Sequence, residues 1–516
     1  MTPRAALQLA ALAMVAVALL HGATLWIGLH HDAYVILHPW SAAELWQAVT
    51  SNWIPGIDPY HRPIDPLIFA AQFAAFGLNA VALHAVSLVG VALATGGLGH
   101  LVRDEAGPVA AGLTMAIYLT HPVLLESTSA LIQNLPQVLC VLLTVLALLR
   151  WRFARQSMTL RGWGPIFALA IVGFYTREDT IMILPAIIAL QYVRWRVHGD
   201  VPPPSRALMV ALVGTLAVLA SIHAMAVPFV WIFDESVSAI ATLGVRVPLY
   251  APVRTALVMF GNGLVLPGAT AFVVLTQVAG LMQAIRRPTS RGAWLWMSGG
   301  VLLVAFSLPL ALASDLRATR LHLAVAAAAV MLGGGLTSLM SLARPRGRHA
   351  VVVAALVIVA GLAAQIAAQR NLFATRFEPC SDSTVWFDQF LPTWPAISDD
   401  VRAWIPTKIA ACASGEALFI NDSIGTVRWA TNTGLAVDAT SATLQLTGPH
   451  DRLCPSMASL NVDGATRAID TCAPTLEVAL TPTWRTWMRQ AHRIDITPDA
   501  SHAMPVVENV SVVRSR

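Results

Sequence analysis

Long apolar runs make up most of this 516-residue sequence, and they constrain its fold more than any other feature. A helix of about 20 apolar residues crosses the hydrocarbon core of a bilayer. Only 12% of the residues are charged, whereas a soluble globular protein carries about 25%. The runs predict about eleven transmembrane helices, near residues 5–28, 80–102, 106–122, 134–150, 163–176, 180–194, 207–230, 256–284, 293–313, 320–342 and 350–369. We therefore expect an all-α polytopic membrane domain over residues 1–370.

The arginines between the runs predict the orientation of the chain. They gather at residues 150–161, 194–206, 286–291 and 344–348, together with Arg4 and Arg103. If eleven spans alternate, all these groups face one side, which is cytoplasmic by the positive-inside rule. The N-terminus is then cytoplasmic, and the odd number of spans places residues 371–516 on the outer side.

The tail from residue 371 is more polar and holds four of the five cysteines. These are Cys380, Cys412, Cys454 and Cys472. An even number fits two disulfides in an oxidising compartment, and four free thiols are the alternative. Strands are expected at 418–420, 442–446, 476–480 and 506–513, and helices at 398–404 and 482–492. The tail is thus predicted to be a small periplasmic α+β domain.

An interrupted apolar run carries the strongest candidate for chemistry. Thr176-Arg177-Glu178-Asp179 ends the run after about a dozen residues, too few to cross a bilayer. Ionisable groups at membrane depth are costly and usually face a polar cavity. Arg177 could bind an anionic phosphate bidentately, and Glu178 could orient it or bind a cation. The alternative is a self-neutralising pair that stabilises a helix break.

Other polar groups lie on the same predicted side. Asp32, next to His31 and Tyr34, could act as a general base or hold a metal, or could be a solvated residue at a helix end. His121 and Glu126 are five residues apart and do not share a helical face, so this spacing gives only weak support for a metal site. A structural role is the alternative.

Two further segments complete the predicted outer side. Arg320 and His322 begin a late span, where they could anchor it at the headgroups or bind phosphate. Residues 66–78 are apolar but too short to span, which favours an interfacial or re-entrant helix.

Five segments in this order resemble the GT-C superfamily of integral-membrane glycosyltransferases, especially the protein O-mannosyltransferase-like branch. They are His31-Asp32-Ala33-Tyr34 through His38-Pro39; Tyr60-His61-Arg62-Pro63 with Phe76-Gly77-Leu78-Asn79 and His84; Thr120-His121-Pro122-Val123 with Glu126; Arg177-Glu178-Asp179 through Leu184-Pro185; and Thr319-Arg320 to His322. The resemblance covers residues 5–370 and leaves the tail unmatched. The sequence departs from the family at Asp32, where a pair of acids is common, and at Arg177, where the family has lysine.

The resemblance implies transfer of a monosaccharide from a polyprenyl-phosphate donor to a periplasmic protein, glycan or lipid, with inversion, at the bacterial inner membrane. By this likeness Asp32 is the catalytic base, and Arg177, Arg320 and Arg62 hold the donor phosphate. Glu126, Glu178, His121 and Tyr34 would shape the site or bind a cation. The expected partners are the lipid-linked donor, membrane lipid and the acceptor, and not nucleic acid. The sequence requires no cofactor, although a divalent cation is compatible with these acids.

A transporter or flippase for a lipid-linked sugar is the main alternative. It would use the same arginines and an apolar groove, but no base. Transporters often contain internal repeats, and none is evident in this sequence. A third possibility is a scaffold protein that acts through its tail.

Overall fold

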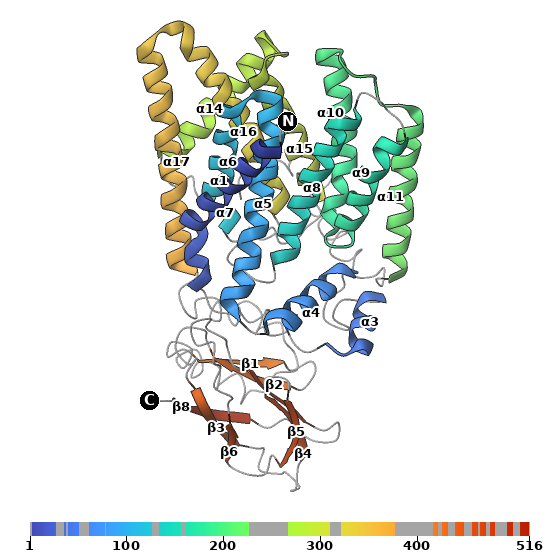
Figure 1. Cartoon of the computed structure of the whole chain (residues 1–516), viewed down its shortest axis with the longest axis vertical. Coiled ribbons are helices and arrows are strands. Elements are labelled where there is room, and N and C mark those ends of the chain that lie inside the picture. Colours follow the sequence, from blue (N-terminus) through green and yellow to red (C-terminus); the bar gives the residue numbers. More distant parts are fainter. Residues whose placement is uncertain are drawn as a thin grey trace, which may run out of the picture.

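The computed structural model describes the helical part of the chain and eight strands of the tail (Figure 1). The described residues are 3–26, 36–37, 40–50, 61–77, 79–125, 134–155, 160–226, 267–309 and 321–376, and in the tail 416–421, 426–431, 439–447, 457–462, 465–470, 475–479, 493–498 and 506–514.

Each of the eleven expected spans coincides with a helix in this part of the chain. The helices are α1 (Pro3–His21), α5 (Ala80–Ala106), α6 (Pro108–Thr120), α8 (Leu135–Ala154), α9 (Leu160–Phe174), α10 (Ile183–His198), α11 (Arg206–Ala226), α14 (Pro267–Arg286), α15 (Arg291–Ser307), α16 (His322–Ala343) and α17 (Arg348–Arg376). Among the residues described, six spans are long and apolar enough to cross a membrane. The helical membrane fold is confirmed, whereas the number of crossings stays a prediction.

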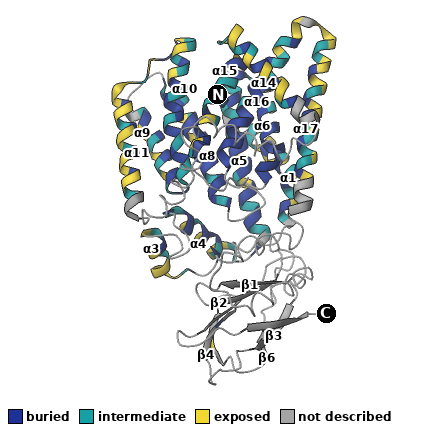
Figure 2. Ribbon diagram, turned by 180° about the vertical axis from the view of Figure 1, so that it is seen from behind, coloured by how far each residue is buried: buried dark blue, intermediate teal, exposed yellow. Residues whose placement is uncertain are grey.

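Helix α16 lies at the centre of the bundle. Inside the protein, 78% of the apolar span of α16 is buried. The buried share is only 17% for α17 and 22% for α1, which lie at the edge of the bundle (Figure 2). A Cβ at Gly334 would lie 2.3 Å from the backbone nitrogen of Trp296 in α15, and one at Gly335 would lie 2.4 Å from the carbonyl oxygen of Thr276 in α14. Glycine therefore lets three helices approach each other closely, as is common in membranes.

Two short helices, α3 (Ala42–Thr50) and α4 (Ile64–Phe76), lie together beyond one end of the long helices (Figure 1). A reciprocal cap starts α3: the Ser41 N–H donates to Glu44 Oε2 over 2.8 Å, and the Glu44 N–H donates to Ser41 Oγ over 3.2 Å. The 13 residues of α4 extend for about 20 Å, less than the hydrocarbon thickness. A helix too short to span is thus confirmed at this position, and its re-entrant or interfacial placement stays a prediction.

The tail forms two antiparallel sheets. One has the order β1-β2-β7-β4-β5 and the other β6-β3-β8. The strands are β1 (Glu416–Asn421), β2 (Thr426–Thr431), β3 (Ala439–Thr447), β4 (Met457–Val462), β5 (Ala465–Asp470), β6 (Thr475–Ala479), β7 (Arg493–Pro498) and β8 (Val506–Arg514). The four expected strands coincide with β1, β3, β6 and β8, and the other four were not expected. The expected helices and the four tail cysteines lie outside the described residues.

Candidate active site

A break between α9 and α10 positions the candidate site. Helix α9 ends at Phe174, and a short 3-10 helix, η4 (Glu178–Met182), leads into α10. The N–H groups of Thr176 and Arg177 both donate to the carbonyl of Gly173, over 3.0 and 2.7 Å. A Cβ at Gly173 would lie 2.3 Å from the Thr180 side chain, so glycine lets η4 fold back against α9. The interruption expected from the sequence is confirmed.

Arg62 and Glu178 form a forked ion pair at this break. Arg62 Nε donates to both Glu178 carboxylate oxygens over 3.1 and 3.2 Å, and Nη2 donates to Oε2 over 3.0 Å. The segment around Arg62 is anchored, because the Ile64 N–H donates to the Tyr175 carbonyl over 3.4 Å. The ring of His61 also meets the Tyr175 ring edge-on at 6.1 Å. The segments around Arg62 and Glu178, which the sequence analysis identified separately, thus lie in contact in the structure.

A second pair links the break to the central helix. His322, the first residue of α16, is fully buried, and its Nε2 lies 3.6 Å from Asp179 Oδ2. Neither ring nitrogen makes a hydrogen bond among the residues described, and neither do Asp179 Oδ1 and Arg177 Nε. Buried polar atoms without partners are costly. This group therefore has the capacity to bind a polar ligand.

The charges of this group do not by themselves favour an anion. Asp65, 3% exposed in the first turn of α4, lies next to Arg62: the Asp65 N–H donates to the Arg62 carbonyl over 3.1 Å. With Glu178 and Arg62 included, the carboxylates exceed the arginines by one. A bound phosphate would therefore need another positive charge. No group of three or more metal-ligand side chains is found in the described part of the chain.

Several predicted site residues lie elsewhere or outside the described ranges. Asp32, Tyr34, Glu126 and Arg320 are outside them. His121 is described: it is 2% exposed and caps the short helix α7 (Pro122–Leu124), with the Val123 N–H donating to its Nδ1 over 3.2 Å. This contact supports a structural contribution from His121.

A polar cluster near α7 was not anticipated from the sequence. The ring of His21 lies 2.9 Å from the Leu119 carbonyl through Nε2, and Gln369 of α17 donates to the same carbonyl over 3.1 Å. Thr120 donates to Gln365 Oε1 over 2.7 Å. These bonds fasten α1 and α17 to the end of α6. Their only signal in the sequence is polar residues inside apolar runs.

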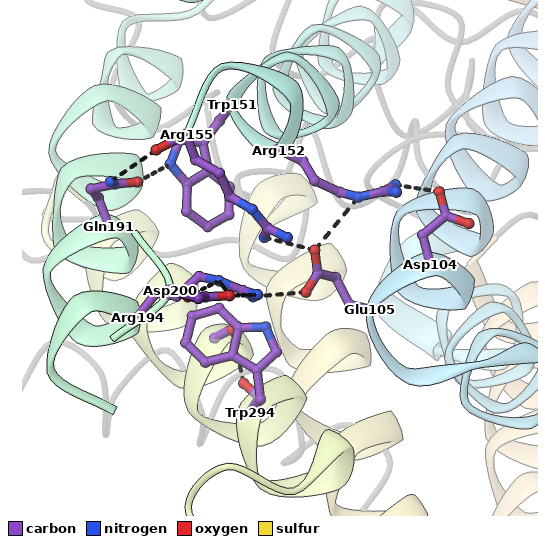
Figure 3. Close-up of polar contacts among 10 residues, drawn as sticks. Asp104, Glu105, Trp151, Arg152, Arg155, Gln191, Arg194, Asp200 and Trp294 are labelled. Atoms are coloured by element: carbon purple, nitrogen blue, oxygen red, sulfur yellow. Dashed lines mark hydrogen bonds and ion pairs between the residues drawn. The ribbon is translucent and has the colours of Figure 1, made fainter. Parts of the chain in front are cut away.

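The opposite end of the bundle holds a larger ionic network, also not anticipated (Figure 3). Glu105, near the end of α5, accepts hydrogen bonds from Arg155 over 2.8 Å and from Arg194 over 2.9 Å. Arg152 lies 3.6 Å from Glu105 and also pairs with Asp104. One acidic pair therefore joins α5 to the ends of α8 and α10.

Arg194 extends this network to α15. Its guanidinium binds Asp200 with contacts of 2.6 to 3.2 Å and lies 5.1 Å from the ring centre of Trp294. Burial alone would raise the pKa of the Asp200 carboxyl, but the hydrogen bonds and charge of Arg194 outweigh it, so the pKa lies below its usual value. The 16 residues of α10 place this network about 24 Å from the candidate site.

The network corrects the placement of the arginines. Arg150, Arg152 and Arg194 lie in helices, not in loops, and Arg155 is the C-cap of α8. The neighbouring acids Asp104 and Glu105 at the end of an apolar run were the signal that could have revealed their partners.

The sequence profile of the dolichyl-phosphate-mannose-protein mannosyltransferase family matches residues 60–225. This stretch contains Arg62, His121, Glu126, Arg177 and Glu178. No curated protein sequence matches the chain.

Three solved structures are distantly similar. The oligosaccharyltransferase of Archaeoglobus fulgidus is 13% identical, with 78% of this chain and 59% of that chain covered and a TM-score of 0.46. ArnT of Cupriavidus metallidurans, bound to undecaprenyl phosphate, is 12% identical, with 76% and 81% covered and a TM-score of 0.42. The arabinosyltransferase EmbB of Mycobacterium smegmatis is 11% identical, with 98% and 64% covered and a TM-score of 0.40.

The chain spans 59% of the length of that oligosaccharyltransferase, and likenesses this distant assign no activity. The sequence match is the stronger finding, because it covers both members of the Arg62–Glu178 pair. It confirms that the chain resembles the membrane glycosyltransferases of the GT-C superfamily, protein O-mannosyltransferase-like branch.

Proposed function

We propose that this protein transfers one monosaccharide from a polyprenyl-phosphate donor to an acceptor hydroxyl on a protein, glycan or lipid, with inversion. The observation that carries the proposal is the joining of Arg62 to Glu178 beside Arg177 at the α9–α10 break. All three residues lie in the segment matched by the mannosyltransferase profile. Buried charges at a helix break in a membrane protein usually serve a polar substrate.

The donor phosphate is proposed to bind Arg177 and Arg320. Arg320 lies two residues before His322 in the sequence and would supply the positive charge that the described group lacks. Arg62 is proposed as the third phosphate ligand, because its ion pair with Glu178 holds it beside Arg177 at the break. Cationic donors stabilise the charge that develops on a leaving phosphate. A divalent cation is the other source of positive charge compatible with these acids.

Asp32 is proposed as the general base. A hydroxyl is a weak nucleophile, and a carboxylate within hydrogen-bond reach takes its proton during the attack. The hydroxyl oxygen bonds to the anomeric carbon while the bond from that carbon to the phosphate oxygen breaks. Polyprenyl phosphate leaves, and a single displacement of this kind inverts the anomeric configuration.

The remaining assignments belong to the same proposal. Glu126, Glu178, His121 and Tyr34 shape the site, which lies at the outer face of a bacterial inner membrane. The tail, residues 371–516, is proposed to be a separate periplasmic domain, because its sheets lie beyond the bundle end that carries α3 and α4 (Figure 1). Its four cysteines are proposed to form disulfides in that oxidising compartment.

The test is transfer of radiolabelled sugar from synthetic polyprenyl-phosphate donors to acceptors in a membrane extract. Wild type should form labelled product, and Asp32→Asn should reduce the rate by about 10²–10⁴-fold because the base is lost. Arg177→Ala should also reduce it. Asp200→Asn is the matched control, since that carboxylate lies at the opposite end of the bundle and should leave the rate unchanged.

Each outcome separates the alternatives. Equal labelling by wild type and Asp32→Asn removes Asp32 from the mechanism. Absence of product with every donor, together with movement of labelled donor across proteoliposomes, overturns the proposal in favour of a transporter. Loss of transfer after chelation, restored by one divalent cation, would assign the missing positive charge to a metal.

A further inference from the structure

We infer that the groove between α8 and α9 binds an anionic phospholipid, with an acyl chain in the groove and the phosphate on Arg150. The groove follows the surface of the bundle from Arg150 to Val172, which lies two residues before α9 ends at the α9–α10 break. It does not depend on the proposed transfer reaction.

The groove is almost entirely apolar. Its volume is about 430 Å³, within the range of small-molecule sites. Its apolar lining comes from Leu146 and Leu149 of α8 and from Pro165, Ala168, Leu169 and Val172 of α9. Leu146 and Val172 are 40% and 41% exposed, so hydrocarbon of the bilayer reaches this surface. A lipid chain matches this lining.

Arg150 is the one charged residue of the lining. Its neighbours Arg152 and Arg155 are bound to acids at the end of α5. Arg150, by contrast, is exposed and makes no hydrogen bond or ion pair with the residues that the structure describes. Its charge therefore remains available for an anion from outside the protein.

The position of Arg150 selects the kind of occupant. Arg150 is four residues before the end of α8, and Pro165 is five residues after the start of α9, so they lie at similar depth near the arginine-rich end. From Pro165 to Val172 the groove extends about 10 Å into the bilayer. A basic residue near the cytoplasmic membrane surface attracts anionic headgroups. A polyprenyl donor is the alternative occupant. If its phosphate were bound at Arg177, its hydrocarbon tail in the groove would not need a cation at the Arg150 end.

The inference is tested with the full-length protein in phosphatidylcholine nanodiscs that contain phosphatidylglycerol with a photoreactive acyl chain. Crosslinks mapped by mass spectrometry should concentrate between residues 146 and 172. Excess phosphatidylglycerol should compete, and excess phosphatidylcholine should not. Arg150→Gln should weaken labelling about fivefold, the factor that corresponds to about 1 kcal/mol for one arginine at an anionic surface.

Two matched controls accompany the variants. Arg286→Gln removes another exposed arginine at a helix end and should leave labelling unchanged. Ala168→Trp should block the groove, whereas Leu356→Trp, on the lipid-exposed face of α17, should not. Labelling that is unchanged in Arg150→Gln, or that is competed equally by phosphatidylcholine, overturns the inference. Stronger competition by polyprenyl phosphate than by phosphatidylglycerol would overturn it too, in favour of the donor tail.

Discussion

Arg62 and Glu178 are 116 residues apart in the sequence, and their pair joins the segment before α4 to the α9–α10 break. Arg62→Ala leaves the carboxylate of Glu178 without this partner. The Glu178 side chain is 27% exposed, so the pair is neither fully exposed nor fully buried. We therefore expect the free energy of unfolding to fall by between about 1 kcal/mol, as for an exposed pair, and about 4 kcal/mol, as for a buried one. The measurement is the free energy of unfolding in a detergent titration.

The double variant Arg62→Ala/Glu178→Ala isolates the pair. It should lose less stability than the two single variants together, since neither charge is then left alone. Arg62→Lys keeps the charge but cannot form the forked contact, and its stability should fall between wild type and Arg62→Ala. Strict additivity of the single variants would contradict an energetic coupling.

At the other end of the bundle, the contact between Asp200 and Arg194 should make the stability of the fold depend on pH. Its folded-state pKa lies below the ordinary value of about 3.9, although burial opposes this, because Arg194 stabilises the carboxylate. The contribution of Asp200 is therefore present above its ordinary pKa and disappears as the pH falls through the lower folded-state value. The unfolding temperature of wild type should exceed that of Asp200→Asn at pH 6, and the gap should narrow steadily as the pH is lowered below about 4. A gap that stays constant or widens under acid would contradict this.

The individual polar residues were only partly predictable. Arg177 and Glu178 stand out because they interrupt an apolar run, and the structure does place them at a helix break. Their partners could not be predicted, since the pairing of Glu178 with Arg62 depends on how α4 docks against Tyr175. Local pattern carries no information about such contacts between distant segments.

Among the helices, the contact of α15 with α16 gives the sharpest prediction. A Cβ at Gly334 would meet the backbone nitrogen of Trp296 at 2.3 Å, and a backbone cannot rotate away as a side chain can. Gly334→Ala should therefore destabilise the protein by about 1–3 kcal/mol. Thermal unfolding in nanodiscs measures the loss.

Gly214 in α11 is the matched control for this substitution. Nothing lies within 4 Å of the position that its Cβ would occupy. Gly214→Ala should raise helix stability by about 0.5–1 kcal/mol, because alanine loses less backbone entropy. If both substitutions had the same effect, close packing at Gly334 would not be its cause.

Helices were easier to predict than strands in this chain. A long apolar run identifies a membrane helix by composition alone, and a helix lies at all eleven expected positions in the described residues. The strands of the tail are short, and four of those described were missed, namely β2, β4, β5 and β7. The sequence between β4 and β5 reads Asp463-Gly464, a two-residue hairpin signal that could have identified these two strands.

At the scale of the whole molecule, the chain has two distinct ends. One carries α3, α4 and, beyond them, the sheets of the tail, and the other carries the ends of α5, α8 and α10 with their arginines (Figure 1). The orientation proposed from arginine placement requires these ends to face opposite sides of the membrane. The acids that pair with Arg152, Arg155 and Arg194 do not weaken that argument, because the rule counts basic residues and not net charge.

Reporter fusions in a bacterial host test this orientation. Alkaline phosphatase, which is active only after export, should be active when fused after Arg516 and inactive when fused after Thr289, in the turn between α14 and α15. A green fluorescent protein that folds only in the cytoplasm should give the opposite pattern at the same two positions. The physical reason is that the arginines at residues 286–291 hold their turn on the cytoplasmic side, and an odd number of crossings carries the tail outside. Phosphatase activity at both positions, or at neither, would contradict an odd number of crossings and the periplasmic tail.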